Sequence, residues 1–376
     1  MKKIQMVDLG SQYLKIKDEI DAGIQDVIDS CAFINGPAVK DFQTDMEKYL
    51  GVKHVIPCAN GTDALQVSMM ALGLKPGDEV ITTSFTFIAT AEVIALLGLT
   101  PVLVDVEPDT YNIDPTAVEK AITPKTKAIV PVHLFGQCAN MEALLSIAEK
   151  HNLHIIEDAC QAIGADYIFN DGSRKKAGTI GDIGCTSFFP SKNLGCYGDG
   201  GAIFTNDDKL ADEMRSIVNH GMKVRYYHDI IGVNSRLDSI QAAILKVKLQ
   251  YLDDYTRERT RAADYYDTAF KAYPQLQVPA RWDKSTHVFH QYTLVTRDID
   301  RNALQQHLMS KDVPAMIYYP VPLHMQKAYL DPRYKAGDFP VTEMLSECVI
   351  SLPMSTELDE EQLEFITSSV IAFLEK

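Results

Sequence analysis

The stretch Ser187-Phe188-Phe189-Pro190-Ser191-Lys192-Asn193-Leu194-Gly195 places one lysine in an apolar, aromatic turn that is followed by glycine-rich sequence. Burial in such surroundings disfavours the charged form of a lysine and leaves an amine that can attack a carbonyl group. Upstream, Glu157-Asp158-Ala159-Cys160-Gln161 places an acid at the end of an apolar strand. Such an acid can keep a ring nitrogen protonated, as a pyridoxal phosphate (PLP) site requires. Lys192 and Asp158 are therefore the first candidates for catalytic residues.

A second candidate segment, Asn60-Gly61-Thr62-Asp63, links a short predicted strand at 55–59 to a helix. Backbone N–H groups at the start of a helix attract anions, and the Thr62 hydroxyl can add one hydrogen bond, so this turn fits a phosphate group. The alternative is that Asn60 or Thr62 only caps the helix.

Strands alternate with helical segments over the first two thirds of the chain. The predicted strands cover 55–59, 79–82, 101–106, 127–132 and 153–157, and the pattern is typical of β-α-β units with a mainly parallel sheet. Ligands bind at the carboxyl ends of the strands in such sheets. Asp158, Gln161, Gly61 and Thr62 each follow a strand, so we expect them to meet in one crevice.

The pattern changes towards the C-terminus. A long helix is predicted over 237–272, strands over 288–295 and around 316–319, and a last helix over 355–375. This indicates two domains: a large domain at 1–250, with an N-terminal arm, and a smaller α+β domain at 251–376.

Composition excludes several classes of partner. The net charge of −15 over 376 residues argues against nucleic acid and anionic membrane surfaces. The apolar runs are too short to span a membrane, and the first residues do not form a secretory signal. Seven scattered cysteines without metal spacing, and histidines without a cluster, predict a cytoplasmic protein with reduced thiols and no zinc site. No G-x-G-x-x-G follows a strand, so a nicotinamide site is poorly supported.

Taken together, the motifs closely resemble the sugar-nucleotide aminotransferases of the DegT/StrS group. The resemblance runs nearly from end to end and is carried by 59–65, 76–81, 157–161, 187–195 and 234–238. It implies the fold-type I PLP fold, which is like that of aspartate aminotransferase: a large, mainly parallel α/β/α sheet domain with a smaller α+β C-terminal domain.

The resemblance also implies roles for individual residues. Lys192 would form a Schiff base with PLP and then move protons, and Asp158 would pair with the ring nitrogen. The other cofactor contacts would be Gln161 at the ring hydroxyl, Gly61, Thr62 and Ser187 at the phosphate, Phe87 stacked on the ring, and Asn234 at the phosphate of the neighbouring subunit. The last contact implies a homodimer with shared sites. His324, Tyr318 and His220 would line the sugar site.

Structural alternatives exist for several of these residues. Gly61 and Ser187 could be purely structural, His324 and Tyr318 could pack the small domain, and an aromatic residue at a strand end, as at Phe87, is usually a core residue.

The resemblance implies transfer of an amino group from L-glutamate, with 2-oxoglutarate as the product, to a keto sugar nucleotide. Residues 190–201 are most like members that act on UDP-2-acetamido-2-deoxy-3-oxo-glucuronate for surface polysaccharide. A uronate carboxylate needs a cationic partner, and Arg236 from the partner subunit is the candidate, with an interface ion pair as the alternative. The rivals are an aminotransferase for a dTDP- or UDP-linked 3- or 4-keto-6-deoxyhexose, a PLP-dependent dehydratase and a PLP-binding regulator. The lysine at 192 favours amino transfer over dehydration.

Overall fold

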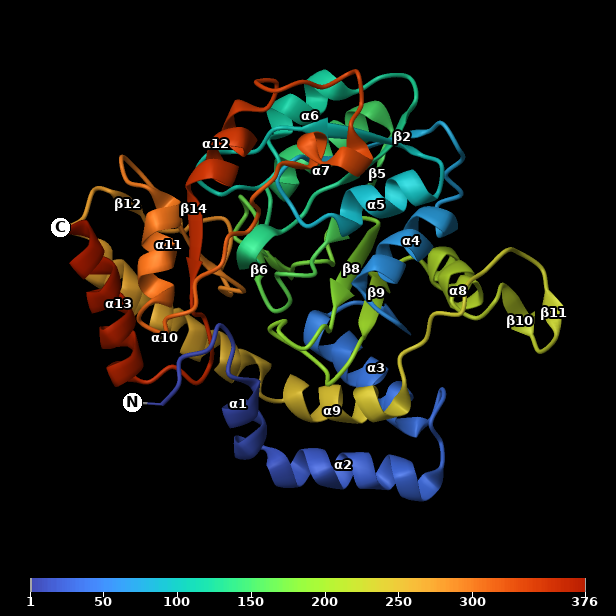
Figure 1. Ribbon diagram of the computed structural model, residues 1–376. Coiled ribbons are helices and arrows are strands. Elements are labelled where there is room, and N and C mark those ends of the chain that lie inside the picture. Colours follow the sequence, from blue (N-terminus) through green and yellow to red (C-terminus); the bar gives the residue numbers. More distant parts are fainter. Residues whose placement is uncertain (1, 376) are drawn as a thin grey trace.

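The centre of the molecule is a seven-stranded sheet, in a computed structural model that describes residues 2–375 (Figure 1). Its strands, in spatial order, are β1 (His54–Cys58), β9 (Gly201–Thr205), β8 (Ile183–Ser187), β5 (His154–Asp158), β4 (Thr126–Val130), β2 (Glu79–Thr83) and β3 (Thr100–Val104). Neighbouring strands from β8 to β3 pair in parallel, and β9 runs antiparallel to both of its neighbours. The predicted, mainly parallel sheet is confirmed.

Helices cover both faces of this sheet because its strands are apolar on both sides. One face packs against α4 (Gly61–Ala71), α5 (Ala89–Leu96) and α8 (Asp208–Ile217). The other packs against α6 (Pro115–Ala121) and α7 (Met141–His151), and at the β1–β9 end against α3 (Pro37–Leu50) and α9 (Ser239–Leu249). The result is the predicted α/β/α arrangement of a fold-type I PLP enzyme.

A second, antiparallel sheet lies in the C-terminal part of the chain. It consists of β12 (Leu276–Gln277), β13 (Tyr292–Thr296) and β14 (Val349–Leu352), and its core is shared with α10 (Leu252–Phe270), α11 (Arg301–Met309) and α13 (Glu360–Leu374). The two ends of the described chain lie on this side of the molecule (Figure 1). The domain boundary at residue 251 stays a prediction.

The remaining elements are short or peripheral. They are α1 (Leu9–Lys15), α2 (Lys17–Ser30), β6 (Asp166–Ile168), β7 (Arg174–Lys176), β10 (Met222–Val224), β11 (Tyr227–His228), α12 (Pro340–Cys348), and the 3₁₀ turns η1 (Leu134–Gly136), η2 (Leu323–Met325) and η3 (Lys327–Tyr329). The β10–β11 hairpin projects from the body beyond α8 (Figure 1). No helix within residues 2–375 combines the length and the apolar character needed to cross a membrane.

Several secondary-structure predictions were wrong in detail. The last helix, predicted from residue 355, begins at Glu360. The helix predicted over 237–272 is two helices, α9 and α10, with a break at 250–251. Strand β13 begins only at Tyr292, because the preceding residues bond to η1 instead of a strand: Val288 N–H donates to the Gly136 carbonyl. Residues 316–319 form no strand, only an isolated bridge from Met316 to Ser351.

Candidate active site

A cavity of about 600 Å³ opens where the carboxyl ends of the central strands meet. This volume is typical of a small-molecule site. Its walls come from segments far apart in the sequence: Asn60, Gly61, Thr62, Asp63, Leu65, Thr86, Phe87, Ala89, Val132, Asp158, Cys160, Gln161, Ser187, Phe189, Ser191, Lys192, Asp199, His290, Gln291, Tyr318 and Tyr319. The strand-end residues predicted to meet in one crevice therefore do so.

Lys192 lies in the turn after β8, at the cavity wall. The turn is closed by a hydrogen bond from the Lys192 backbone N–H to the Phe189 carbonyl (2.8 Å). Lys192 Nζ has no hydrogen-bond or ion-pair partner among the described residues. Burial lowers the pKa of this lysine, against the opposing effects of Cys160 and Asp158. The side chain is therefore an unattached amine that loses its proton more readily than an exposed lysine.

Asp158 is the last residue of β5, with 5% of its surface exposed. Its backbone is held by neighbouring strands and loops: its N–H donates to the Pro131 carbonyl, and its carbonyl accepts from His133. Its carboxylate accepts one hydrogen bond at each oxygen, from Thr90 Oγ1 to Oδ2 (2.8 Å) and from the Cys160 N–H to Oδ1 (3.2 Å). This buried carboxylate lines the cavity without an ion-pair partner among residues 2–375.

The turn before α4 forms an anion-binding corner of the cavity. The Asn60 side chain caps the helix by accepting from the Asp63 N–H (2.8 Å), and the N–H groups of Gly61 and Thr62 have no partner in the described chain. A Cβ at Gly61 would lie 2.8 Å from Ser187 Cβ and 2.9 Å from Cys160 Sγ, so only glycine fits. Unpaired N–H groups at a helix start attract phosphate.

Aromatic and amide side chains form the rest of the wall. Gln161 is fixed at both ends, since its Oε1 accepts from the Phe135 N–H (2.8 Å) and its Nε2 donates to the Tyr319 hydroxyl (2.9 Å). Phe87 is 55% exposed, and the centroid of its ring lies 6.4 Å from that of the Tyr319 ring. Phe87 is thus not a core residue, and an exposed flat face lines the cavity. Tyr318, beside Tyr319, lines it as well.

His324 lies away from this wall. Its side chain is buried, with Nε2 3.2 Å from Glu343 Oε1, and its ring packs edge-on against Phe339 at 4.7 Å. His324 Nδ1 has no hydrogen-bond partner in the described chain. The arrangement matches the packing alternative, and a sugar contact by His324 stays a prediction.

His220, Asn234 and Arg236 also lie outside the cavity lining of this chain. His220 and Asn234 are exposed, on the two segments that flank the β10–β11 hairpin, and a backbone bridge joins Asn219 to Asn234. Arg236 forms no ion pair with any described carboxylate. Between them in sequence, the buried Ser235 accepts a hydrogen bond from the Ala59 N–H (3.0 Å), which fixes this segment next to the Gly61 turn.

Two buried residues, one behind the cavity wall and one in it, were missed by the sequence interpretation. Thr90 bonds Asp158, and His290 lies at the cavity with its Nδ1 3.3 Å from Asn193 Oδ1. Burial, followed by the charges of Lys192 and Arg259, lowers the pKa of His290 well below its usual value, so the ring is neutral. Neither residue carries a motif, because each contacts the site only through tertiary packing.

These groups fit PLP. The unpaired N–H groups at Gly61 and Thr62 suit its phosphate, the free amine of Lys192 suits its aldehyde, and the buried carboxylate of Asp158 suits its ring nitrogen. Burial also raises the pKa of the neighbouring Cys160 thiol well above its usual value, so Lys192 and not Cys160 is the nucleophile in this wall.

Comparisons with known proteins show the family of the chain. Residues 14–371 match the DegT/DnrJ/EryC1/StrS aminotransferase family. The chain is 48% identical over 98% of both chains to a pleiotropic regulatory protein of Geobacillus stearothermophilus. It is 46% identical, over 98% of this chain and 99% of the other, to UDP-2-acetamido-2-deoxy-3-oxo-D-glucuronate aminotransferase of Pseudomonas aeruginosa.

Among solved structures, the fold matches that of S. venezuelae DesV in complex with a ketimine intermediate. The TM-score is 0.95 at 37% sequence identity, and the match covers 100% of both chains. The family match spans far more than half of this chain and includes the Lys192 turn and the strand end at Asp158. The chain is therefore a member of the DegT/DnrJ/EryC1/StrS family of PLP-dependent aminotransferases.

Proposed function

We propose that the protein transfers the amino group of L-glutamate to the C3 ketone of UDP-2-acetamido-2-deoxy-3-oxo-glucuronate, in the cytoplasm, for a surface polysaccharide such as lipopolysaccharide. The observation that carries the proposal is the similarity over nearly the whole chain to the P. aeruginosa enzyme that bears this substrate in its name. The free amine of Lys192 supports amino transfer over dehydration.

Each residue of the cavity wall would have its own role in the reaction. When bound, PLP supplies a ring that takes up electrons from the carbon next to the transferred nitrogen. Lys192 Nζ would take a proton from the α-carbon of glutamate and later give one to C3 of the sugar. Asp158 would hold a proton at the ring nitrogen, and Gln161 would contact the ring hydroxyl. The remaining cofactor contacts would be Gly61, Thr62 and Ser187 at the phosphate and Phe87 against the ring.

A second copy of the chain would complete each site. The exposed Asn234 would reach the phosphate bound by the partner subunit, which makes the enzyme a homodimer with shared sites. Arg236, which has no ion-pair partner in the described chain, would bind the uronate carboxylate with its guanidinium. Tyr318, which lines the cavity, and the more distant His324 and His220 would contact the sugar.

The test is an assay with a panel of UDP- and dTDP-linked keto sugars, with L-glutamate as donor and 2-oxoglutarate as the measured product. We expect the UDP-linked 3-oxo-uronate to have the highest kcat/KM. Preference for a 3- or 4-keto-6-deoxyhexose would replace the proposed substrate with the rival one. Loss of water from the sugar without release of 2-oxoglutarate would show a dehydratase instead.

A further inference from the structure

Thr90 makes an unusual contact for a residue in the first turn of a helix. It lies near the start of α5, next to the cavity residue Ala89, and only 1% of its surface is exposed. A buried threonine in a helix commonly bonds a carbonyl of the preceding turn. Thr90 Oγ1 instead lies 2.8 Å from Asp158 Oδ2, on a strand of the central sheet. The Thr90 hydroxyl donates this hydrogen bond, and the carboxylate oxygen accepts it.

This hydrogen bond fixes the orientation of the Asp158 carboxylate, which the backbone hydrogen bonds of the residue do not determine. The backbone bonds to Pro131 and His133 hold the main chain, but they do not set the rotation of the carboxylate. The Cys160 N–H contacts Oδ1 at 3.2 Å, and the shorter Thr90 bond holds Oδ2. The plane of the carboxylate is therefore set from both oxygens, one of them through α5.

We propose that Thr90 is a positioning residue for the transamination: its hydroxyl keeps the Asp158 carboxylate turned into the cavity, where that carboxylate would hold the proton on the ring nitrogen of PLP. This rests on the proposed role of Asp158. Without this hydrogen bond, only the Cys160 N–H holds the carboxylate, which can then rotate and weaken its contact with the ring nitrogen.

The test compares Thr90→Val, which keeps the shape and removes the hydroxyl, with Thr90→Ser, which keeps the hydroxyl. Thr82→Val is the matched control, because Thr82 is a similarly buried threonine, in strand β2, whose hydroxyl donates to the Val130 carbonyl and not to Asp158. Three quantities are measured: the ¹⁵N chemical shift of the ring nitrogen in PLP labelled there, the Kd of PLP for the apoenzyme, and the rate of the half-reaction with glutamate.

In Thr90→Val we expect the ¹⁵N signal to move towards that of an unprotonated pyridine. We also expect the Kd of PLP to rise about 3- to 10-fold and kcat of the half-reaction to fall roughly 10- to 100-fold, with little change in KM, because a hydrogen bond to a charged group is lost. Thr90→Ser and Thr82→Val should keep the wild-type ¹⁵N shift. With a PLP analogue that has carbon in place of the ring nitrogen, Thr90→Val and wild type should react at equal rates.

An unchanged ¹⁵N shift in Thr90→Val would overturn the proposal, as would an equal shift in Thr82→Val. If Thr90→Val does not fold, a wild-type shift in Thr90→Ala or a displaced shift in Thr90→Ser would overturn it. None of these measurements uses a sugar nucleotide. A wrong sugar assignment would therefore leave them unchanged and would appear only in the substrate panel.

Discussion

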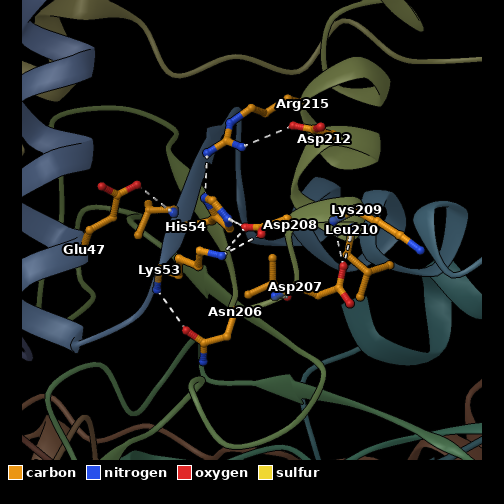
Figure 2. A network of polar contacts seen from close by, with 12 residues as sticks. Glu47, Lys53, His54, Asn206, Asp207, Asp208, Lys209, Leu210, Asp212 and Arg215 are labelled. Atoms are coloured by element: carbon orange, nitrogen blue, oxygen red, sulfur yellow. Dashed lines mark hydrogen bonds and ion pairs between the residues drawn. The ribbon is translucent and has the colours of Figure 1, made fainter.

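Two of the places where lysine and aspartate lie near each other differ in what the charges contact. On the surface between β1 and α8, Lys53 Nζ lies 2.6 Å from Asp208 Oδ2, and His54 Nε2 lies 2.7 Å from Asp208 Oδ1 (Figure 2). In the cavity, Lys192 Nζ has no partner in the described chain, and Asp158 accepts only from Thr90 and a backbone N–H. The surface charges neutralise each other, whereas the cavity charges are left for a ligand.

The pKa shifts on the surface and in the cavity also have different causes. Hydrogen bonds from Lys53 and then His54 lower the pKa of Asp208, so this exposed carboxylate stays charged at neutral pH. Burial lowers the pKa of Lys192, with only partial opposition from Cys160 and Asp158. A charged partner keeps a lysine inert, while burial without a bonded partner prepares it as a nucleophile. Substitutions in each setting can test this difference.

The largest effect is expected from Lys192→Ala. Removing the amine takes away both the covalent attachment of PLP and the proton carrier, so turnover should fall by about 10⁴-fold or more. The visible absorption band of the lysine-bound cofactor should also disappear. The matched control is Lys53→Ala, which removes a lysine that already has a partner and should leave turnover at the wild-type level. Residual turnover with an intact band would disprove the assignment of Lys192.

Glu157→Ala tests a third kind of carboxylate, which is buried like Asp158 but accepts hydrogen bonds at both oxygens from several donors. Glu157 adjoins Asp158 but accepts from His133 Nε2 (2.8 Å) and from the backbone N–H groups of Gly178, Ile180 and Gly181. Removing it leaves these buried donors unsatisfied, so the free energy of unfolding should fall by roughly 3–5 kcal/mol. Urea denaturation measures this loss.

The control for this prediction is Asp158→Ala. Asp158 accepts fewer bonds, so its removal should reduce activity much more than stability. An unfolding free energy of Glu157→Ala within about 1 kcal/mol of wild type, the typical cost of a point mutation, would show that the four contacts contribute little.

The core of the site was predictable because its signals are local. Asp158 ends a strand, the Lys192 and Gly61 turns each follow one, and parallel strands bring such positions to one edge of the sheet. The glycine at 61 and the cap at Asn60 are likewise explained by the chemistry of one turn.

Other features depend on packing between segments that no sequence pattern links. Thr90 and Tyr319 contact Asp158 and Gln161 across 68 and 158 positions of sequence. The prediction of a strand from residue 288 was wrong for the same reason. The alternating apolar pattern does not show that the Val288 N–H donates to η1 and not to a neighbouring strand. The roles of residues proposed to act in the site of a second subunit, such as Arg236, depend on contacts with the partner chain as well.

A moderate effect is expected from Arg236→Ala, which tests a cation that has no partner in the described chain. If Arg236 binds the uronate carboxylate, kcat/KM for the sugar should fall about 10- to 100-fold, the value of a charge-assisted hydrogen bond. The half-reaction with glutamate should change little. Arg215→Ala is the control, since Arg215 already donates to His54 Nδ1 (3.3 Å) on the surface (Figure 2). Equal loss of both half-reactions in Arg236→Ala would indicate a structural arginine.

The smallest effect is expected from Asp208→Asn in the exposed network. Because the folded state lowers the pKa of Asp208 from its ordinary value of 3.8, the stability that it adds is present above that value and is lost as the pH falls through the lowered pKa. Exposed ion pairs add little, so the melting temperatures of variant and wild type should agree within error at pH 7. Any difference must vanish in acid. A clearly lower melting temperature of the variant at pH 7 would show that the surface network holds α8 on β1. The surface network and the cavity groups would then differ in their access to a ligand, and the surface contacts could not be called weak.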